Sequence, residues 1–452
     1  MELKDKDVLV LGLGMTGWSA ARFCAARGAR VVAADERPES AIEDLDSLRA
    51  VPGVREVITG APFPDPADFD VTVPSPGVAR ARYGERARRA WGDIELAGRA
   101  LAVPIVAVTG TNGKSTTVRL IEAMLGAAGL RARAAGNVGT PVLGLVGDPL
   151  DVAVLEVSSF QLEATESFRP NVAVVLNVTP DHLDRHGDLA GYAAAKQRLL
   201  AHQLPEDVAV LSFDDPLVRD MAKHTRAEVL PVSCRAPIVD TAIRRAAWLD
   251  TGAVVLRNDG DTTRIDLTAG PLAGAHNREN VLAALAAAWV SGADPHAAAR
   301  ALADFRPLPH RSQLVATLAG LRWVDDSKAT NPGAAIRALE GAAGRVIWIA
   351  GGRGKDLPFD ALADAAQDRV VHALLLGEAA GEIERTLAGR VECERVDDIE
   401  TAVRRAAAVG QDADVVLLAP GCSSLDQFKS FEERGERFQR AVRSLEQEAI
   451  SR

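Results

Sequence analysis

Short apolar runs rich in valine and alanine recur along the chain, and each is followed by a stretch of helix-forming residues. Uninterrupted apolar runs of this length are typical of strands buried on both faces, which predicts parallel α/β units throughout. The expected strands lie in DVLVLG (7–12), ARVVAAD (29–35), FDVTVPSPGV (69–78), VPIVAVTG (103–110), DVAVLEVSS (151–159), NVAVVLNVT (171–179), DVAVLSFDD (207–215), RWVDDSK (322–328), RVIWIAGG (345–352), VHALLLGE (371–378) and DVVLLAPG (414–421).

Two further patterns complete the expected elements. Alternating runs on either side of Asn258-Asp259-Gly260 predict a β-hairpin. The stretch AHNRENVLAALAAAW (275–289) begins with capping-type residues and continues as an alanine- and leucine-rich helix. We place domain boundaries near residue 98 and in the proline-containing FRPLPHR (305–311), which gives three α/β domains at 1–98, 99–307 and 308–452.

Composition narrows the class of protein. The 452 residues carry 52 lysines and arginines against 62 acids, a formal charge of −10, with no basic block that would indicate nucleic-acid binding. Four scattered cysteines without a C-x-x-C pair are expected to be reduced thiols of a cytoplasmic protein. The N-terminal MELKDKDVLVLG passes from charged residues directly into an expected strand, so we expect no signal peptide. No apolar run is long enough to span a membrane, and we expect a soluble protein that binds anionic ligands by local groups.

The hexapeptide GLGMTG (12–17) has the spacing G-x-G-x-x-G, and Asp35 closes the next apolar run. This combination is the fingerprint of a dinucleotide-binding βαβ unit. The same loop geometry suits any diphosphate, so NAD and another pyrophosphate are both open from this motif.

The most specific motif is VAVTGTNGKSTT (106–117), a shortened P-loop between an expected strand and an expected helix. Its glycines would let backbone N–H groups face phosphate oxygens, with Lys114 on the β- and γ-phosphates and Ser115 or Thr116 on Mg²⁺. This favours ATP or GTP over NAD. Glu156 ends an apolar run, and a buried carboxylate requires a cation, either Mg²⁺ or a basic side chain.

Other polar positions are ambiguous on their own. His182 lies in an acidic loop, Lys196 has the pattern of a solvated helix lysine, and Asn277 and Asn280 could cap a helix or bind a nucleotide. In the last third, polar residues follow expected strands, where open α/β sheets bind ligands. These are Asp326, Lys328, Thr330, Lys355, Ser424 and Phe431.

The motifs GTNGKST, EVSSFQLE, NVTPDHLDRHG with a lysine one helix later, AHNREN, DDSKATNP and SLDQFKSFEERG together resemble the Mur ligases of bacterial peptidoglycan synthesis, in that family's order and over nearly the whole chain. GLGMTG, DER, SPG and SLDQF resemble the branch that adds D-glutamate to UDP-N-acetylmuramoyl-L-alanine. The resemblance implies a Rossmann-like N-terminal UDP-binding domain, a central P-loop-type ATPase domain with a mostly parallel sheet, and a Rossmann-like C-terminal domain bearing the amino-acid site. It also implies a cytoplasmic enzyme, expected to be monomeric, that makes an amide through an acyl phosphate and a tetrahedral intermediate.

The resemblance assigns roles residue by residue. It implies two Mg²⁺ ions and no NAD, with Ser115, Glu156, His182 and a CO₂-derived carbamate on Lys196 as metal contacts. ATP would be bound by Gly110, Thr111, Asn112, Gly113, Lys114, Ser115, Thr116, Asn277, Asn280, Arg311 and Asp326. The UDP substrate would be bound by Gly14, Met15, Thr16, Asp35, Arg37, Ser75, Pro76, Gly77, Asn137, Ser158, Gln161 and His182. D-Glutamate would contact Thr330, Lys355, Ser424 and Phe431, and the catalytic set would be Lys114, His182, Lys196, Lys328 and Lys355.

Three alternatives compete with this interpretation. An NAD-dependent oxidoreductase accounts only for Gly12, Gly14, Gly17 and Asp35 and leaves the P-loop unexplained. A nucleotide-regulated binding module without amide chemistry leaves the lysines and acids of the last domain unexplained. The third alternative catalyses the most similar reaction: a Mur ligase of different amino-acid specificity, or a folylpolyglutamate synthase. Folate enzymes, however, lack the N-terminal UDP domain.

Overall fold

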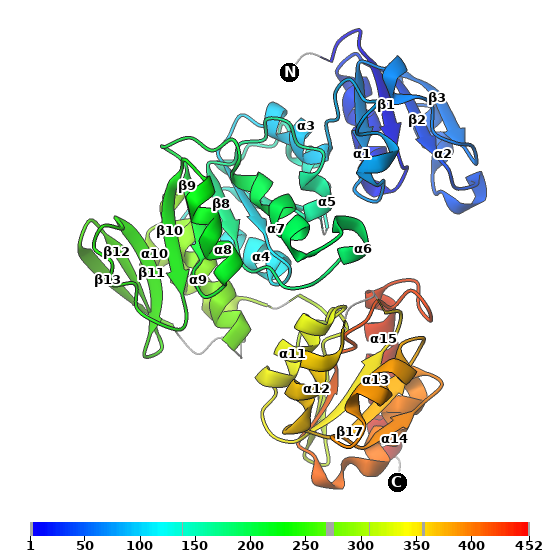
Figure 1. Cartoon of the computed structure of the whole chain (residues 1–452), viewed down its shortest axis with the longest axis vertical. Coiled ribbons are helices and arrows are strands. Elements are labelled where there is room, and N and C mark those ends of the chain that lie inside the picture. Colours follow the sequence, from blue (N-terminus) through cyan, green and yellow to red (C-terminus); the bar gives the residue numbers. More distant parts are fainter. Residues whose placement is uncertain (1–2, 138, 268–274, 307, 355–357, 451–452) are drawn as a thin grey trace. The chain divides into compact units, whose positions relative to one another are not determined.

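The computed structural model describes residues 3–137, 139–267, 275–306, 308–354 and 358–450 (Figure 1). These form two compact units. The first comprises Met1–Val178, Ala190–Gly270 and Glu279–Phe305, and the second comprises Thr179–Leu189, Pro271–Arg278 and Arg306–Arg452. Among them they carry three sheets, so the predicted three-domain α/β class is confirmed.

The N-terminal sheet of the first unit is parallel throughout, in the order β3-β2-β1-β4. Helix α1 (Met15–Ala26) starts directly after the glycine loop that follows β1, and α2 (Leu45–Arg49) precedes β3. The carboxyl ends of β2, β1 and β4 are therefore neighbours, which brings the loops after Asp35, Leu11 and Pro74 together. The strands are β1 (Asp7–Leu11), β2 (Arg30–Asp35), β3 (Val54–Thr59) and β4 (Val71–Pro74).

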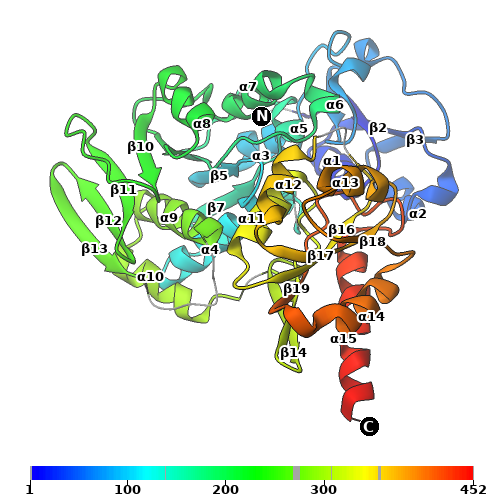
Figure 2. The ribbon, with the colours of Figure 1, turned by 60° about the horizontal axis from the view of Figure 1, so that its bottom comes forward.

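The central sheet has nine strands in the order β13-β12-β11-β10-β9-β8-β5-β7-β6. Figure 2 shows β13, β12, β11 and β10 at one end of this sheet. It is parallel from β6 to β11, and only β12 and β13 run antiparallel to their neighbours, as the predicted hairpin requires. The strands are β5 (Ile105–Thr109), β6 (Ala132–Gly136), β7 (Val152–Glu156), β8 (Val172–Val175), β9 (Val208–Ser212), β10 (Glu228–Ser233), β11 (Arg245–Asp250), β12 (Ala253–Asn258) and β13 (Asp261–Asp266).

Four helices of this sheet follow or carry the sequence motifs that lie near the carboxyl ends of β8, β5 and β7. Helix α4 follows the P-loop, α5 carries the SFQL part of the EVSSFQLE motif, α7 carries Lys196 and α9 carries Asn280. Edge strand β13 is polar, and Ile265 is its one buried residue. The helix bounds are α4 (Lys114–Ala127), α5 (Ser159–Leu162), α7 (Leu189–Gln197), α8 (Pro216–Met221), α9 (Ala275–Val290) and α10 (Pro295–Asp304).

Helix α3 (Asp93–Ala100) spans the boundary that the sequence placed near residue 98. Its buried Glu95 accepts hydrogen bonds from the backbone N–H groups of Glu166 (2.9 Å) and Ser167 (3.0 Å), in the segment after α5. The helix thus packs on the central segment and forms part of the connection between the two sheets of the first unit.

The sheet of the second unit has the order β14-β15-β19-β16-β17-β18 and is parallel except for the β14–β15 pair. Helices α11, α12 and α13 cover one face, and α14 and α15 cover the other. The strands are β14 (Gln313–Leu318), β15 (Leu321–Asp325), β16 (Val346–Gly351), β17 (Val370–Leu376), β18 (Cys393–Arg395) and β19 (Val415–Leu418). The helices are α11 (Pro332–Gly341), α12 (Asp360–Gln367), α13 (Ala380–Leu387), α14 (Ile399–Val409) and α15 (Phe431–Ile450), with the short α6 (Leu183–His186) in the segment 179–189.

Candidate active site

The glycine loop after β1 is held in shape by its own sheet. Gly12 has φ of +82°, and its carbonyl accepts a hydrogen bond from Ser75 Oγ at 2.7 Å. A Cβ on Gly17 would lie 1.8 Å from the Gly12 carbonyl oxygen, so only glycine allows α1 to start this close to the loop. Asp35 Oδ2 accepts a hydrogen bond from Leu13 N at 2.7 Å. The G-x-G-x-x-G spacing therefore folds as the sequence predicts.

Asp35 is already paired within the fold. The residue is 5% exposed, and its carboxylate accepts hydrogen bonds from Arg37 Nε (3.0 Å) and Arg37 Nη2 (2.8 Å) as well as from two backbone N–H groups. Burial alone would raise the pKa of Asp35, but these hydrogen bonds outweigh it and lower the pKa to about 2. Asp35 is thus an anion that orients both Arg37 and the glycine loop.

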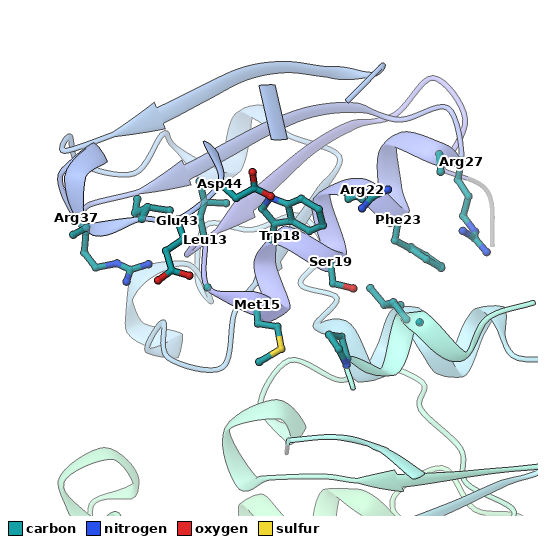
Figure 3. A pocket seen from close by; sticks show the side chains of 17 residues that line it. Leu13, Met15, Trp18, Ser19, Arg22, Phe23, Arg27, Arg37, Glu43 and Asp44 are labelled. Carbon is teal, nitrogen blue, oxygen red and sulfur yellow. The ribbon is translucent and has the colours of Figure 1, made fainter. Parts of the chain in front are cut away.

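A cavity of about 930 Å³ opens beside this loop (Figure 3). Gly14, Met15 and Arg37 line it, and Met15 is 68% exposed. Figure 3 shows that the side chains of Met15, Ser19 and Phe23 lie along α1 at the cavity wall. Thr16 belongs to the same first turn of α1, whereas Ser75, Pro76 and Gly77 form the adjoining loop after β4.

The P-loop connects β5 to α4 as predicted. Gly110 and Gly113 have φ of +155° and +89°, which L side chains rarely adopt. Lys114 Nζ folds back over the loop and donates to the carbonyl oxygens of Gly110 (2.9 Å) and Thr111 (3.0 Å). Ser115 and Thr116 are buried in the first turn of α4, whose positive end faces the loop.

Asn177, which the sequence reasoning did not select, braces the P-loop from the end of β8. Its carbonyl accepts from Thr111 N at 2.8 Å, its Oδ1 accepts from Asn112 N at 2.9 Å, and its Nδ2 donates to Asn112 O at 3.2 Å. The available signal was a polar residue directly after the apolar run VAVVL, at a neighbouring strand end.

Glu156 lies at the end of β7, where its backbone pairs with Val108 of β5. The side chain is 2% exposed, and Oε1 accepts from Asn137 Nδ2 at 3.1 Å. Its Oε2 is buried without a hydrogen-bond partner among the described residues, so no basic side chain donates to that oxygen there. The alternative of a buried salt bridge is therefore not what this carboxylate forms.

Lys196 is buried, with 1% of its surface exposed, although its helix α7 gave it the pattern of a solvated lysine. Its Nζ donates to Gly110 O at 2.9 Å and lies 4.3 Å from the ring centroid of Tyr192. Two lysine side chains, those of Lys114 and Lys196, thus share the carbonyl of Gly110.

Ser158 and Gln161 form a capping box at the start of α5. Gln161 Oε1 accepts from Ser158 N at 3.0 Å, and Gln161 Nε2 donates to Asp93 Oδ2 of α3 at 2.9 Å. Asp93 is buried, and burial raises its pKa to about 6 against the hydrogen bond from Gln161. These side chains therefore hold α5 against α3, and this structural role is independent of the predicted contact with the substrate.

Asn280 of α9 lies against the P-loop. Its Oδ1 accepts from Thr117 Oγ1 at 3.4 Å, and a Cβ on Gly113 would lie 2.2 Å from the same oxygen. A narrow crevice beside it is lined by Asn177, Ser212, Asp214, Cys234 and Glu279. Asn277 stands one turn earlier on the same helix.

His182 belongs to the second unit, in the segment Thr179–Leu189. It adopts the left-handed conformation (φ +53°, ψ +35°), and its backbone N–H donates to Asp181 Oδ1 at 3.0 Å. The other oxygen of Asp181 accepts from Asn331 Nδ2 at 2.8 Å and lies 3.6 Å from His182 Nε2. His182 is thus tied to the residue that follows Thr330 in the DDSKATNP motif.

The polar residues of the last domain gather at the ends of β15, β19 and β16, which are neighbours. Lys328 Nζ lies 3.7 Å from the ring centroid of Phe431. Burial raises the pKa of Asp326 to about 6, while the charge of Arg311 acts in the opposite direction. Ser424 is buried in the loop after β19, and its carbonyl accepts from Phe428 N at 2.9 Å. The predicted Lys355 lies outside the described residues.

A buried network that the sequence reasoning missed supports this cluster. His310 Nδ1 and Asp325 Oδ2 are 2.7 Å apart, and the hydrogen bond with Asp325 raises the pKa of His310. Gln439 Nε2 donates to the same carboxylate at 2.8 Å. Because His310 and Asp325 precede Arg311 and Asp326 in the sequence, the network fixes the backbone of both predicted nucleotide contacts.

Comparison with known proteins decides the family. Residues 108–288 match the Mur ligase middle domain, residues 310–422 match the Mur ligase glutamate ligase domain, and residues 6–88 match the MurD-like N-terminal domain of Mur ligases. The UDP-N-acetylmuramoylalanine–D-glutamate ligase of Geobacter metallireducens is 41% identical over 98% of this chain and 99% of its own length. That of Anaeromyxobacter dehalogenans is 44% identical over 97% and 98%.

The chain belongs to the Mur ligase family.

Solved structures of Mur ligases and related enzymes share the fold. A pseudomurein peptide ligase type C from Methanothermus fervidus has a TM-score of 0.63 at 17% identity and covers 98% of this chain and 100% of its own. The MurF ligase from Thermotoga maritima in complex with ADP has a TM-score of 0.61 at 18% identity, with coverages of 98% and 96%. As the family membership implies, this Mur ligase is ATP-dependent.

The residues beside the P-loop of this Mur ligase fit a Mg²⁺ ion whose remaining ligands are waters and substrate phosphates. The buried, unpartnered Oε2 of Glu156 is a hard oxygen donor beside the P-loop. No group of three or more His, Cys, Asp or Glu side chains in the described ranges forms a complete protein cage. Mg²⁺ commonly keeps several waters and binds one or two carboxylates together with substrate phosphates, which suits this donor set. Among the same residues, no helix has both the length and the apolar character to cross a bilayer.

Proposed function

We propose that this Mur ligase joins D-glutamate to UDP-N-acetylmuramoyl-L-alanine at the expense of ATP, releasing ADP and phosphate. The observation that carries the proposal is the similarity, over 97–98% of the chain, to proteins named as D-glutamate ligases at 41% and 44% identity. The match of residues 6–88 to the MurD-like N-terminal domain supports the same substrate class. We further propose a cytoplasmic monomer with a UDP-sugar domain at 1–98, an ATPase domain at 99–307 and an amino-acid domain at 308–452.

The UDP-sugar is proposed to bind by its diphosphate at the glycine loop. The N–H groups at the start of α1 and the helix dipole favour an anion at Gly14, Met15 and Thr16. Arg37, held by Asp35, lines the same cavity and would face the uridine end. In this scheme the glycine loop binds the UDP substrate, and NAD is not used. The remaining proposed contacts are Ser75, Pro76, Gly77, Asn137, Ser158, Gln161 and His182.

The first chemical step activates the alanyl carboxylate. Its oxygen attacks the γ-phosphorus of ATP, the bond to the bridging oxygen breaks, and ADP leaves with that electron pair. Lys114 and the loop residues Gly110–Thr116 would neutralise the phosphates, because phosphoryl transfer depends mainly on positioning and charge compensation. The proposed contacts on the nucleoside side are Asn277, Asn280, Arg311 and Asp326.

The second step makes the amide. The neutral amine of D-glutamate attacks the carbonyl carbon of the acyl phosphate, giving a tetrahedral intermediate. The intermediate expels phosphate as the amine loses its proton. The two carboxylates of the amino acid require cations and hydroxyl donors, and the residues proposed to hold it are Lys328, Thr330, Lys355, Ser424 and Phe431.

Metal binding is proposed at Ser115, Glu156, His182 and a carbamate on Lys196. When bound, Mg²⁺ would compensate the charge that develops on the transferred phosphoryl group. Reaction of neutral Lys196 with CO₂ would replace an ammonium with an anion suited to a second ion. The buried position of Lys196 beside the P-loop, with Nζ 2.9 Å from Gly110 O, supports this proposal. Extra density beyond Nζ and activity that depends on CO₂ are expected, and a plain ammonium with no CO₂ dependence would disprove it.

The proposed activity is tested by phosphate release with a panel of UDP-muramoyl acceptors and amino acids. Release is expected only when ATP, UDP-N-acetylmuramoyl-L-alanine and D-glutamate are all present. Turnover with a different amino acid or acceptor would assign the chain another specificity within the family, because a few contacts decide that choice. Phosphate release without an acceptor would indicate a nucleotide switch.

A further inference from the structure

His182 is held in an unfavourable backbone conformation by its neighbour. A non-glycine residue at φ +53° is uncommon, and such outliers persist where surrounding contacts fix them. The contact here is the 3.0 Å hydrogen bond from His182 N to Asp181 Oδ1. The carbonyl of His182 in turn accepts from Arg185 N and His186 N, each at 3.1 Å, so the conformation also starts α6.

Asn331 fixes Asp181 from the body of the second unit. Its Nδ2 donates to Asp181 Oδ2 at 2.8 Å, while its Oδ1 caps α11 by accepting from Ala334 N at 2.8 Å. Both side chains are buried, with 5% of Asp181 and 4% of Asn331 exposed. One amide therefore both caps a helix and holds the carboxylate that orients His182.

We propose that Asp181 and Asn331 are positioning residues that set the orientation of His182 from the amino-acid domain. The inference rests on the proposed function, in which His182 contacts metal or substrate and Thr330, the residue before Asn331, contacts D-glutamate. The path from Thr330 through Asn331 and Asp181 to His182 contains two short hydrogen bonds and no long flexible side chain. A change at the D-glutamate site is thereby transmitted to His182.

Exchanging the two side chains provides the sharpest test. In D181N the new amide can accept from His182 N, but its NH₂ group then faces the NH₂ group of Asn331. In N331D two carboxylates face each other in a buried position. In the double variant D181N/N331D, the carboxylate at position 331 caps α11 and accepts from the amide at position 181, whose own oxygen accepts from His182 N. Every bond is then restored, with the donor and acceptor of the pair reversed.

Two readouts are needed. Each single variant is expected to lower kcat roughly 10- to 100-fold, the range of a lost hydrogen bond to a charged group, with the KM for ATP unchanged. Amide exchange in residues 179–189, followed by mass spectrometry, is expected to accelerate in both single variants. The double variant is expected to recover most of both quantities.

Two further variants separate positioning from capping. N331S keeps an N-cap for α11 but loses the donor to Asp181, so it should lower kcat and accelerate amide exchange in residues 179–189 while exchange in α11 stays near that of the parent. D398N changes the cap of α14 in the same unit and should leave both readouts unchanged. The proposal is overturned if the single variants or N331S match the parent, or if the double variant recovers neither readout. If the parent itself fails to use D-glutamate, the proposed function fails, whereas the exchange data still decide whether the pair holds His182.

Discussion

Replacing Gly113 with alanine should disable the P-loop without touching any charged group. The residue has φ of +89° and ψ of −15°, and it is the last loop residue before α4. A Cβ there would lie 2.2 Å from Asn280 Oδ1, 3.2 Å from Asn280 Cγ and 3.2 Å from Leu176 Cδ1. Asn280 is buried, so its side chain cannot move away without disturbing its neighbours.

The expected loss of stability has two parts. The left-handed conformation costs an alanine about 1–2 kcal/mol relative to glycine. Displacing Asn280, with its contact to Thr117, adds about 1–3 kcal/mol as an overpacking term. We therefore expect the free energy of unfolding of the first unit to fall by about 2–5 kcal/mol, and the affinity for Mg²⁺-ADP to fall at least about tenfold, since about 1.4 kcal/mol corresponds to a factor of ten.

The assay is thermal and denaturant unfolding together with calorimetric titration of Mg²⁺-ADP. Gly126 provides a matched control in the same helix, because it is exposed and a Cβ there meets no atom within 4 Å. G126A should stabilise the chain by about 0.5–1 kcal/mol, the propensity difference between alanine and glycine in a helix, and leave nucleotide affinity unchanged.

Two results would refute this reasoning. G113A with parental stability and parental nucleotide affinity would show that the loop tolerates a side chain at this φ. Equal destabilisation by G113A and G126A would show that the effect comes from the helix in general and not from the contact with Asn280.

Three further predictions follow from hydrogen bonds and pKa values. N177A removes both side-chain bonds to Asn112, so the affinity for Mg²⁺-ADP measured by calorimetry should fall roughly 10-fold, while N177D should lose more, because it places a carboxylate oxygen against the Asn112 carbonyl and a negative charge beside the loop. Burial raises the pKa of Asp93 to about 6, so the protonated carboxyl stabilises the fold fully below about pH 4, and this stabilisation is lost as the pH rises through 6. In denaturant unfolding, D93N should therefore be about 2–3 kcal/mol more stable than the parent at pH 8 and similar to it at pH 4. Burial would raise the pKa of Asp35, but its hydrogen bonds with Arg37 and the backbone lower it to about 2, so its contribution to stability is present above about pH 4 and is lost as the pH falls through 2; D35N should be about 2 kcal/mol less stable at pH 7, and the difference measured by denaturant unfolding should vanish near pH 2.

The elements that the sequence predicted well are those whose signal is local. The valine-rich runs became β5, β7, β8 and β9, because a strand buried on both faces must be apolar at every position. Strand β6, with the sequence ARAAG, was not predicted because alanine and arginine carry little strand preference and only its pairing with β7 makes it a strand. The short β18 is likewise defined by its partner β17.

The candidate active site shows the same difference between local signals and long-range contacts. The P-loop was predictable, since its glycines, its lysine and its place between strand and helix lie close together in the sequence. The burial of Lys196 was not, because α7 shows no pattern that distinguishes a buried lysine from a solvated one, and its partner Gly110 lies 86 residues earlier. The pairing of Gln161 with Asp93, 68 residues apart, was hidden for the same reason.

The hairpin at the end of the central sheet has a consequence for handling and engineering the protein. An open sheet ends in edge strands with unpaired backbone groups, and an apolar edge strand would recruit other chains. Here the edge is β13, with Asp261, Arg264 and Asp266 exposed beside a single buried isoleucine, which makes it a poor template for sheet extension. Its turn at Asp259 and Gly260 is exposed, so a short tag or label inserted at this tip should be tolerated while polar β13 keeps this edge of the sheet from pairing with other chains.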